Sequence, residues 1–469
     1  MISFQNFSFR YEESKNFTLR GIDMTVRTGE FILLTGRSGC GKTTLIRSLN
    51  GLIPHFYPGE IKGDLLMDGH SLLEMKPSEL AGQVGTVFQD PRSQFFMTDT
   101  TRELAFGCEN LAFPPEKIER QIETVCRLMN LGRSRQCRTL SGGQKQRLIT
   151  ASTLAMGQKI LILDEPLANL DKDGAAMLMR TLRSLAEAGY AVVVIEHRLD
   201  MVLPYVDTVW HVGGGRIDAV GNRQTYLAEQ TAKIEDICPV FAGTESLFSL
   251  DKVAFSVKDR EILKGVTCEI PRGGRTVLLG ENGCGKTTLM RLIARLCRPT
   301  GGTIAQYIDE KLSQKPKGSK AWYRKVGVVY QNPDYQLFMP TVEREIAFGA
   351  PSPAYAERIA ELFQVRHLWQ RHPQSLSEGQ KRRVSIAAAV ACAPEVLLLD
   401  EPTVGQDYDG LCAMTDILNR LHAETGNSMI TVTHDVRCAE ALCDRAFLIQ
   451  DGVIKRQGGK ELVREYFSR

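Results

Sequence analysis

The 469-residue chain lacks several features that mark particular classes of protein. It has no uninterrupted apolar run of the roughly 18 residues that a membrane-spanning helix needs. Its first ten residues lack the charged-then-apolar layout of a secretory signal. Lysine and arginine number 58 against 55 acidic residues, so the net charge of +3 gives no electrostatic footprint for nucleic acid. We therefore expect a chain that stays in the cytosol and binds no nucleic acid.

The twelve cysteines form no CxxC pair and show no metal-ligand spacing. This pattern argues against a zinc site or a disulfide framework, and reduced thiols are expected. Two of them, Cys40 and Cys284, lie in glycine-rich segments, where a small residue is the simplest interpretation.

One glycine-rich segment occurs twice, as GRSGCGKTT at 36–44 and as GENGCGKTT at 280–288. A loop of this type surrounds nucleotide phosphates with backbone N–H groups, while its lysine meets the outer phosphates and the next hydroxyl holds Mg²⁺. The residues expected to surround the phosphates are Gly36, Arg37, Ser38, Gly39, Cys40, Gly41, Lys42, Thr43 and Thr44 in the first half, and Gly280, Glu281, Asn282, Gly283, Cys284, Gly285, Lys286, Thr287 and Thr288 in the second.

Four further segments recur in the same order and at similar spacing, which indicates a duplicated unit. They are VFQDP at 87–91 and VYQNP at 329–333, LSGGQ at 140–144 and LSEGQ at 376–380, ILILDEP at 160–166 and VLLLDEP at 396–402, and the histidines His197 and His434.

Short apolar runs predict buried strands that lead into these segments. They are 31–35, 160–163 and 192–195 in the first half, and 276–279, 396–399 and 429–432 in the second. Because the carboxyl ends of parallel strands share one edge of a sheet, the polar groups should gather there. The length fits two α/β domains of about 230 residues. We place a first domain at 1–230, a linker at 231–246 and a second domain at 247–469.

This set of motifs resembles the ATP-binding cassette (ABC) family over nearly the whole chain. The resemblance implies two tandem P-loop nucleotide-binding domains, each with a mostly parallel sheet core, an antiparallel β subdomain and a helical signature subdomain. In that family the signature of one domain completes the nucleotide site of the other. Ser141 and Ser377 stand where a helix should begin, so the hydroxyl and the helix dipole favour a γ-phosphate held opposite.

Carried over residue by residue, the resemblance implies two ATP sites. The first takes Lys42, Thr43, Gln89, Asp164, Glu165 and His197, facing Ser377, Gly379 and Gln380. The second takes Lys286, Thr287, Gln331, Asp400, Glu401 and His434, facing Ser141, Gly143 and Gln144. The threonines, glutamines and aspartates would hold Mg²⁺, the glutamates would polarise the attacking water, and the histidines would sense the γ-phosphate.

Within that family, the segments at 89–107 and 331–349 and the EHRLD stretch at 196–200 are similar to the ATPases of energy-coupling factor (ECF) importers of vitamins and transition-metal ions. The likeness implies a peripheral protein on the cytoplasmic face of the membrane. Its partners would be an integral-membrane scaffold and a substrate-binding membrane protein, and a fused pair of cassettes would supply both ATPase domains. Phe95, Phe96, Leu337 and Phe338 either line an apolar docking groove or pack in the core.

Three other functions stay open at this point. A sugar importer with fused cassettes commonly has one degraded site, whereas both sites are intact here. A twin-cassette translation factor would need a long charged insert, and a repair ATPase would need long heptad repeats.

The two sites should differ in how they hold the base. Cassette proteins stack adenine on an aromatic residue upstream of the glycine loop, and Tyr11 is placed for that in the first half. Val257 aligns with it and offers no ring, so we expect weaker binding at the Lys286 site. Glu378 in LSEGQ acts in the opposite direction, because its carboxylate repels phosphate at the first site.

Overall fold

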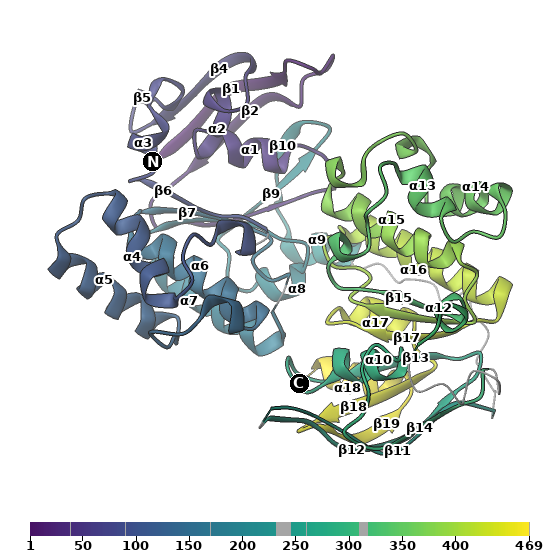
Figure 1. The fold of residues 1–469 in the computed structure, drawn as a ribbon. Helices are drawn as coiled ribbons and strands as arrows, with labels where there is room; N and C mark the ends of the chain where they lie inside the picture. The colour runs from purple at the N-terminus through teal and green to yellow at the C-terminus, as the bar shows by residue number, and fades with distance from the viewer. Residues whose placement is uncertain are drawn as a thin grey trace. The chain divides into compact units, whose positions relative to one another are not determined.

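The computed structural model describes residues 1–37, 39–89, 91–168, 170–230, 245–258, 260–308 and 318–468. The chain divides into two compact units, Met1–Ala232 and Lys233–Arg469. Each unit is built from the same three parts: a mostly parallel sheet, an antiparallel sheet and a group of helices (Figure 1). The linker placed at 231–246 lies outside the described residues except for its last two, and Ser246 already begins a strand.

The first unit has a six-stranded sheet of order β10-β9-β3-β8-β7-β6, in which only the β9–β10 pair is antiparallel. Its strands are β3 (Phe31–Thr35), β6 (Val84–Val87), β7 (Ile160–Asp164), β8 (Ala191–Ile195), β9 (Thr208–Gly213) and β10 (Arg216–Ala219). Every residue of β3 and β8 is buried, as expected for a sheet covered on both faces. The apolar runs predicted as strands therefore form the core of this sheet.

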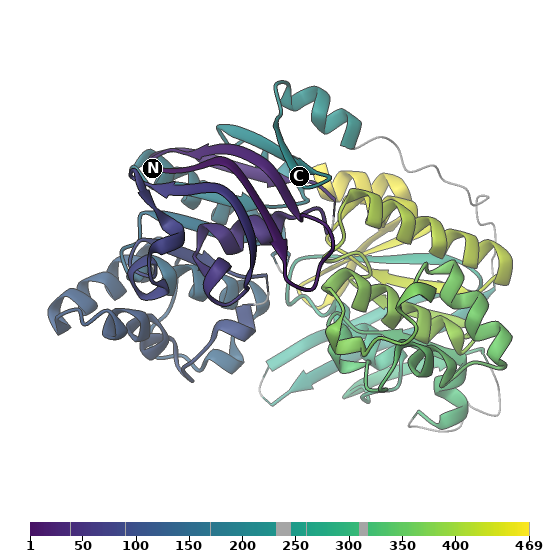
Figure 2. The same ribbon diagram turned by 90° about the horizontal axis from the view of Figure 1, so that it is seen from above.

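A smaller antiparallel sheet of order β2-β1-β4-β5 packs beside it, and Figure 2 shows its long strands lying side by side. These strands are β1 (Ile2–Tyr11), β2 (Leu19–Val26), β4 (Gly59–Met67) and β5 (His70–Ser71). The helices of the unit are α1 (Lys42–Leu49), α2 (Leu52–His55), α3 (Pro77–Leu80), α4 (Thr100–Asn110), α5 (Pro115–Leu128), α6 (Gly142–Ala155), α7 (Lys172–Glu187), α8 (Leu199–Val202) and α9 (Arg223–Gln230). Helices α4, α5 and α6 pack on one another and form the helical part.

The second unit repeats this plan. Its six-stranded sheet has the order β15-β16-β17-β13-β18-β19, with β13 (Arg275–Leu279), β15 (Val326–Val329), β16 (Val396–Asp400), β17 (Ser428–Val432), β18 (Arg445–Gln450) and β19 (Val453–Gly458). Its antiparallel sheet has the order β12-β11-β14, with β11 (Ser246–Val257), β12 (Arg260–Pro271) and β14 (Gly301–Gln306).

The helices of the second unit are α10 (Lys286–Ile293), α12 (Lys320–Lys325), α13 (Val342–Ala347), α14 (Pro353–Leu362), α15 (Glu378–Ala391), α16 (Tyr408–Thr425), α17 (Val436–Ala441) and α18 (Lys460–Ser468). Helices α13, α14 and α15 form its helical part (Figure 1). The structure thus shows the α/β fold that the duplicated motifs predicted, with all three expected parts in both units.

Candidate active site

The glycine loops lie between a central strand and the helix that follows it. Gly36 after β3 and Gly280 after β13 have φ of 141° and 146°, a region that favours glycine. A Cβ at Gly36 would overlap the carbonyl oxygen of Val212, and a Cβ at Gly280 would overlap that of Ile449. Each loop therefore packs directly on the neighbouring strand, β9 or β18, and only glycine fits there.

The loop lysines are buried and point back into their own loops. Lys42 donates from Nζ to the carbonyl oxygens of Gly36 at 2.6 Å and Arg37 at 2.9 Å. In the second unit Lys286 donates to the two equivalent carbonyls at the same distances. Helices α1 and α10 begin at these lysines, so each ammonium group lies at a helix N-terminus, where anions are favoured. Ser38 lies outside the described residues.

The two acidic pairs stand at the carboxyl ends of the central strands β7 and β16. Glu165 and Glu401 have φ of 46° and 53°, a left-handed conformation that costs a non-glycine residue energy. Their N–H groups donate to the carbonyls of Ile195 and Val432, both at 2.9 Å. The same strained backbone therefore turns the glutamate side chain out of the strand in both units.

In the first unit three polar side chains meet at Glu165. Gln89 donates from Nε2 to Oε2 of Glu165 at 2.8 Å, and Nε2 of His197 lies 3.5 Å from Oε1. Burial alone would raise the pKa of Glu165, but its interactions with His197, Lys42 and Gln89 outweigh burial and hold this pKa below its usual value. The carboxyl group therefore stays ionised, as a group that orients and polarises water must be.

The neighbouring carboxyl groups respond differently to burial. Burial and the charge of Glu165 raise the pKa of Asp164 to about 7. No motif assigns a role to Glu196, which is buried directly after β8 and accepts hydrogen bonds from the N–H groups of Leu167 at 2.8 Å and His197 at 2.9 Å. Burial raises its pKa as well. Thr433 holds the equivalent position after β17, so only the first unit places a third acid here.

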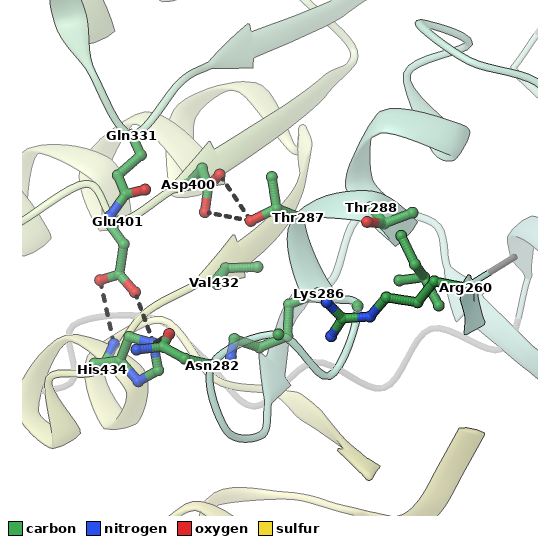
Figure 3. Close-up of a pocket in the computed structure, with 13 residues that line it drawn as sticks. Arg260, Asn282, Lys286, Thr287, Thr288, Gln331, Asp400, Glu401, Val432 and His434 are labelled. Atoms are coloured by element: carbon green, nitrogen blue, oxygen red, sulfur yellow. Dashed lines mark hydrogen bonds and ion pairs between the residues drawn. The ribbon is translucent and has the colours of Figure 1, made fainter. Parts of the chain in front are cut away.

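The second unit holds a cavity of about 260 Å³ over its glycine loop (Figure 3). The hydroxyl of Thr287 donates to Asp400 at 3.1 Å, and Nε2 of His434 lies 3.6 Å from Oε1 of Glu401. His434 also shares a 3.0 Å hydrogen bond with Oδ1 of Asn282. The cavity is lined by Arg260, Ile262, Asn282, Gly283, Gly285, Lys286, Thr287, Thr288, Gln331, Asp400, Glu401, Val432 and His434.

The oxygen atoms at one side of this cavity suit Mg²⁺. The hydroxyl of Thr287 and the carboxylate of Asp400 are within hydrogen-bonding distance of one another, and Gln331 lines the same wall. Such hard oxygen donors are the ligands that Mg²⁺ takes. Burial raises the pKa of Asp400, and a bound cation would favour its ionised form. The residues present therefore fit the metal that the glycine loop implies.

The signature residues begin a helix in both units. Ser141 and Ser377 are the N-caps of α6 and α15, and each forms a capping box with the glutamine three residues later, Gln144 or Gln380. Within each unit, no hydrogen bond or ion pair among the described residues joins these four side chains to that unit's own glycine loop. The signature is thus not brought to the phosphate loop of its own unit.

Two other predicted positions have clear local roles. Gly379 accepts a hydrogen bond through its carbonyl oxygen from Nε2 of Gln406 at 2.9 Å, which ties the signature to the loop before α16. Gly143 is the corresponding residue of α6. Tyr11 shares a 3.1 Å hydrogen bond between its hydroxyl and Oγ1 of Thr44, and Val257 is 49% exposed at the end of β11.

The apolar residues that follow the two glutamine loops, the segments that begin at Gln89 and Gln331, fall into two groups. Phe95 packs against the core and Leu337 is 4% exposed within it, so of the two expected roles Leu337 has the core-packing one and does not line a docking groove. Phe96 and Phe338 are 70% and 69% exposed. One apolar side chain of each pair faces inward, and the other stands on the surface.

A model of the ABC transporter family matches this chain over residues 19–168 and 263–404. The chain belongs to the ABC transporter family. It is 34% identical over 482 residues to a Treponema denticola protein named "Putative ABC transporter ATP-binding protein", with 97% of both chains covered. It is 32% identical over 496 residues to a Bacillus subtilis protein named "Putative HMP/thiamine import ATP-binding protein YkoD", covering 96% of this chain and 90% of that one.

Among solved structures, the fold is similar to a chain from the complex of an archaeal ribosomal stalk protein and a ribosome recycling factor. The TM-score is 0.69 at 20% identity, over 99% of this chain and 92% of the other, and this likeness concerns the fold alone. The protein is thus a two-cassette ABC ATPase, and its units are called the first and second cassette below. In the described part of the chain, no helix is both long and apolar enough to cross a bilayer.

Proposed function

We propose that this chain is the ATP-hydrolysing subunit of an ABC importer of the energy-coupling factor type. The segments after both glutamine loops support the subclass, and the Bacillus subtilis relative is named for import of thiamine, a vitamin. The chain works on the cytoplasmic face of the membrane beneath an integral-membrane scaffold, which carries a substrate-binding membrane protein.

Hydrolysis in the first cassette uses the contacts around Glu165. The carboxylate accepts a proton from a water as the water oxygen bonds to the γ-phosphorus, and the bond from that phosphorus to the bridging oxygen breaks to release ADP. His197, 3.5 Å from the same carboxylate, is placed to contact the γ-phosphate. Glu401 and His434 do the same in the second cassette.

Mg²⁺ would be held by Thr43, Asp164 and Gln89 in the first cassette, and by Thr287, Asp400 and Gln331 in the second. When bound, the metal would neutralise phosphate charge. Lys42 and Lys286 leave the loop carbonyls that they now contact and turn to the phosphates.

Each nucleotide also needs a signature from another cassette. The capped N-termini at Ser141 and Ser377 offer a hydroxyl, free N–H groups and the positive end of a helix dipole, all of which favour phosphate. The two cassettes pair head to tail, within one chain or between two chains, and so complete both sites.

The observation that carries the transport function is the way each glutamine loop continues into an exposed phenylalanine. Buried Glu103 on α4 accepts hydrogen bonds from the N–H groups of Phe96 at 3.0 Å and Met97 at 2.8 Å. Buried Glu345 on α13 does the same for Phe338 at 2.9 Å and Met339 at 2.7 Å. A fixed apolar side chain is therefore presented next to each glutamine loop, and in the first cassette Gln89 of this loop contacts the carboxylate of Glu165, as coupling to a membrane partner requires.

The surface around these side chains is aromatic in both cassettes. Phe96 stacks on Phe106 with ring centroids 4.8 Å apart, and Phe338 meets the exposed Phe348 edge to face at 5.9 Å. Exposed rings such as those of Phe96, Phe338 and Phe348 are typical of surfaces that bind a partner.

The test is co-expression with the membrane proteins encoded beside the gene, followed by purification from membranes and reconstitution in vesicles. We expect the chain to copurify with a scaffold and to drive ATP-dependent uptake of a vitamin or metal ion. The double change Phe338→Ser and Phe348→Ser should reduce copurification while leaving ATP binding intact. An ATPase that binds no membrane protein would refute the proposal, and uptake of a sugar would refute the ECF subclass.

A further inference from the structure

The second cassette places an arginine in its nucleotide cavity that no motif predicts. Arg260 is the first residue of β12, and its side chain lines the cavity over the glycine loop. Figure 3 shows Gln331, Asp400 and Glu401 on one side of Lys286, and Arg260 on the other side, beside Thr288. The arginine therefore lies away from the carboxylates and the γ-phosphate end of the cavity.

The first cassette has a tyrosine at the corresponding place. Tyr11 contacts Oγ1 of Thr44 through its hydroxyl at 3.1 Å, and Thr44 is the third residue of α1 as Thr288 is of α10. Val257, which aligns with Tyr11 in sequence, is not among the residues that line the cavity. Arg260 and Tyr11 thus stand beside equivalent threonines although they lie on different strands.

A difference in hairpin length explains the exchange. Residues 12–18 connect β1 to β2 in the first cassette, whereas only residues 258–259 connect β11 to β12 in the second. Val257 and Arg260 are therefore direct cross-strand partners at the end of the sheet. Because so few residues join β11 to β12, the start of β12 lies at the cavity. The side chain of Arg260 therefore lines the part of the cavity beside Thr288.

We propose that Arg260 holds the base of the nucleotide in the second cassette, with its guanidinium plane stacked on the purine. This inference rests on the proposed nucleotide site at Lys286. A planar, weakly hydrated guanidinium stacks well on aromatic rings, and no described residue forms a hydrogen bond or ion pair with that of Arg260. Ile262 supplies an apolar wall beside it.

The experiment uses the full chain with Lys42→Ala to silence the first site. Isothermal titration calorimetry measures binding of Mg-ATP and of Mg-tripolyphosphate, which has the phosphates but no base. Arg260→Ala should weaken ATP binding roughly two- to thirty-fold and tripolyphosphate binding by less than about twofold. Arg260→Tyr should restore ATP binding, and Arg260→Lys should not.

The outcomes of these titrations distinguish a wrong role for Arg260 from a wrong nucleotide site. Equal loss of ATP and tripolyphosphate binding in Arg260→Ala would mean that the arginine contacts phosphate, and full ATP binding by this variant would mean that it contacts neither. Full binding by Arg260→Lys would show that charge alone suffices. Any one of these three results would overturn the proposal that Arg260 stacks on the base, while leaving the nucleotide site itself in place. If the unmodified background bound no ATP, and Lys286→Ala changed nothing, the nucleotide site itself would be wrong.

Discussion

Gln89 donates a 2.8 Å hydrogen bond from Nε2 to Oε2 of Glu165, and the same loop runs on to the exposed ring of Phe96. The side-chain amide of Gln89 therefore takes up an oxygen of the carboxylate that is expected to bind the attacking water. A shift of this loop, transmitted from a partner bound at Phe96, would release Glu165 for hydrolysis. This contact gives the physical link between docking and chemistry on which the transport proposal depends.

Removing the base should stop hydrolysis without stopping binding. Glu165→Gln keeps the size and hydrogen-bonding shape of the side chain but cannot take a proton, so turnover should fall at least about tenfold. Adding Glu401→Gln should nearly abolish phosphate release, while calorimetry still detects ATP binding. Glu109→Gln, an exposed change on α4, serves as the control. Wild-type turnover in the double variant would refute the assignment of both glutamates.

The ring of Tyr11, more than its hydroxyl, should set nucleotide affinity in the first cassette. In a Lys286→Ala background, Tyr11→Ala should weaken ATP binding about five- to 150-fold, the range for loss of base–aromatic stacking. Tyr11→Phe keeps the ring and loses only the hydrogen bonds with Thr44 and Arg47, so its affinity should stay close to that of the background. An equal loss of ATP affinity in both variants would show that the hydroxyl, and not the ring, sets the affinity.

The sequence predicted three strands of each six-stranded sheet to within one residue, because strands buried on both faces read as unbroken apolar runs. The run at 31–35 matches β3 in full. The run at 276–279 misses the first residue of β13, Arg275, a charged side chain that is buried because it pairs with Asp444 at 2.6 Å. A run of apolar residues does not indicate a buried charged residue whose ion-pair partner lies far along the chain.

The repeated motifs also picked out acids, amides and histidines that the structure brings together in each cassette, since strand order carries these to one edge of the sheet. The motifs did not predict Arg260 at the cavity, because its position depends on the length of the hairpin between β11 and β12 and not on a motif. Its presence also bears on the expected inequality of the sites: Val257 offers no ring, but Arg260 stands beside Thr288 where Tyr11 stands beside Thr44 in the first cassette. The sequence also could not tell which of the adjacent apolar residues Leu337 and Phe338 is exposed, because their side chains face opposite ways.

Arg382 should stabilise the glutamine loop of the second cassette. It is 1% exposed on α15 and donates to the carbonyl oxygens of Tyr330, at 2.8 Å, and of Gln331. Arg382→Gln leaves these carbonyls without their donor and should lower the free energy of unfolding by about 1–3 kcal/mol. The equivalent residue in the first cassette is Gln146, whose buried Nε2 has no partner among the described residues.

Tryptophan fluorescence during urea denaturation can measure this change. Of the three tryptophans only Trp210 lies in the first cassette, so a Trp210→Phe background reports on the second cassette through Trp322 and Trp369. The matched control is Arg383→Gln, which changes the adjacent, less buried arginine. The same transition midpoint for Arg382→Gln and Arg383→Gln would show that the loop contacts contribute nothing.

Glu345 offers a pH test of the segment that presents Phe338. Burial raises the pKa of Glu345 above that of an unfolded glutamate, although the N–H groups of Met339 and Phe338 oppose this. Below the unfolded pKa the side chain is protonated in both states, and as pH rises through the folded pKa the native state alone bears the cost of a buried charge. Wild-type stability, relative to Glu345→Gln, should therefore be higher near pH 5 than near pH 7.5.

Urea denaturation in the Trp210→Phe background at both pH values measures this difference, with the exposed Glu361→Gln as control. Glu345→Ala should instead cost about 1–3 kcal/mol at either pH, because the N–H groups of Phe338 and Met339 lose their acceptor. Glutamine retains an acceptor oxygen, so only the alanine change should also weaken copurification with the membrane scaffold. If alanine left both stability and copurification unchanged, Glu345 would not hold this segment in place. If the wild type were relatively more stable near pH 7.5, the charged form would be the favoured one and the inferred cost of burial would be wrong.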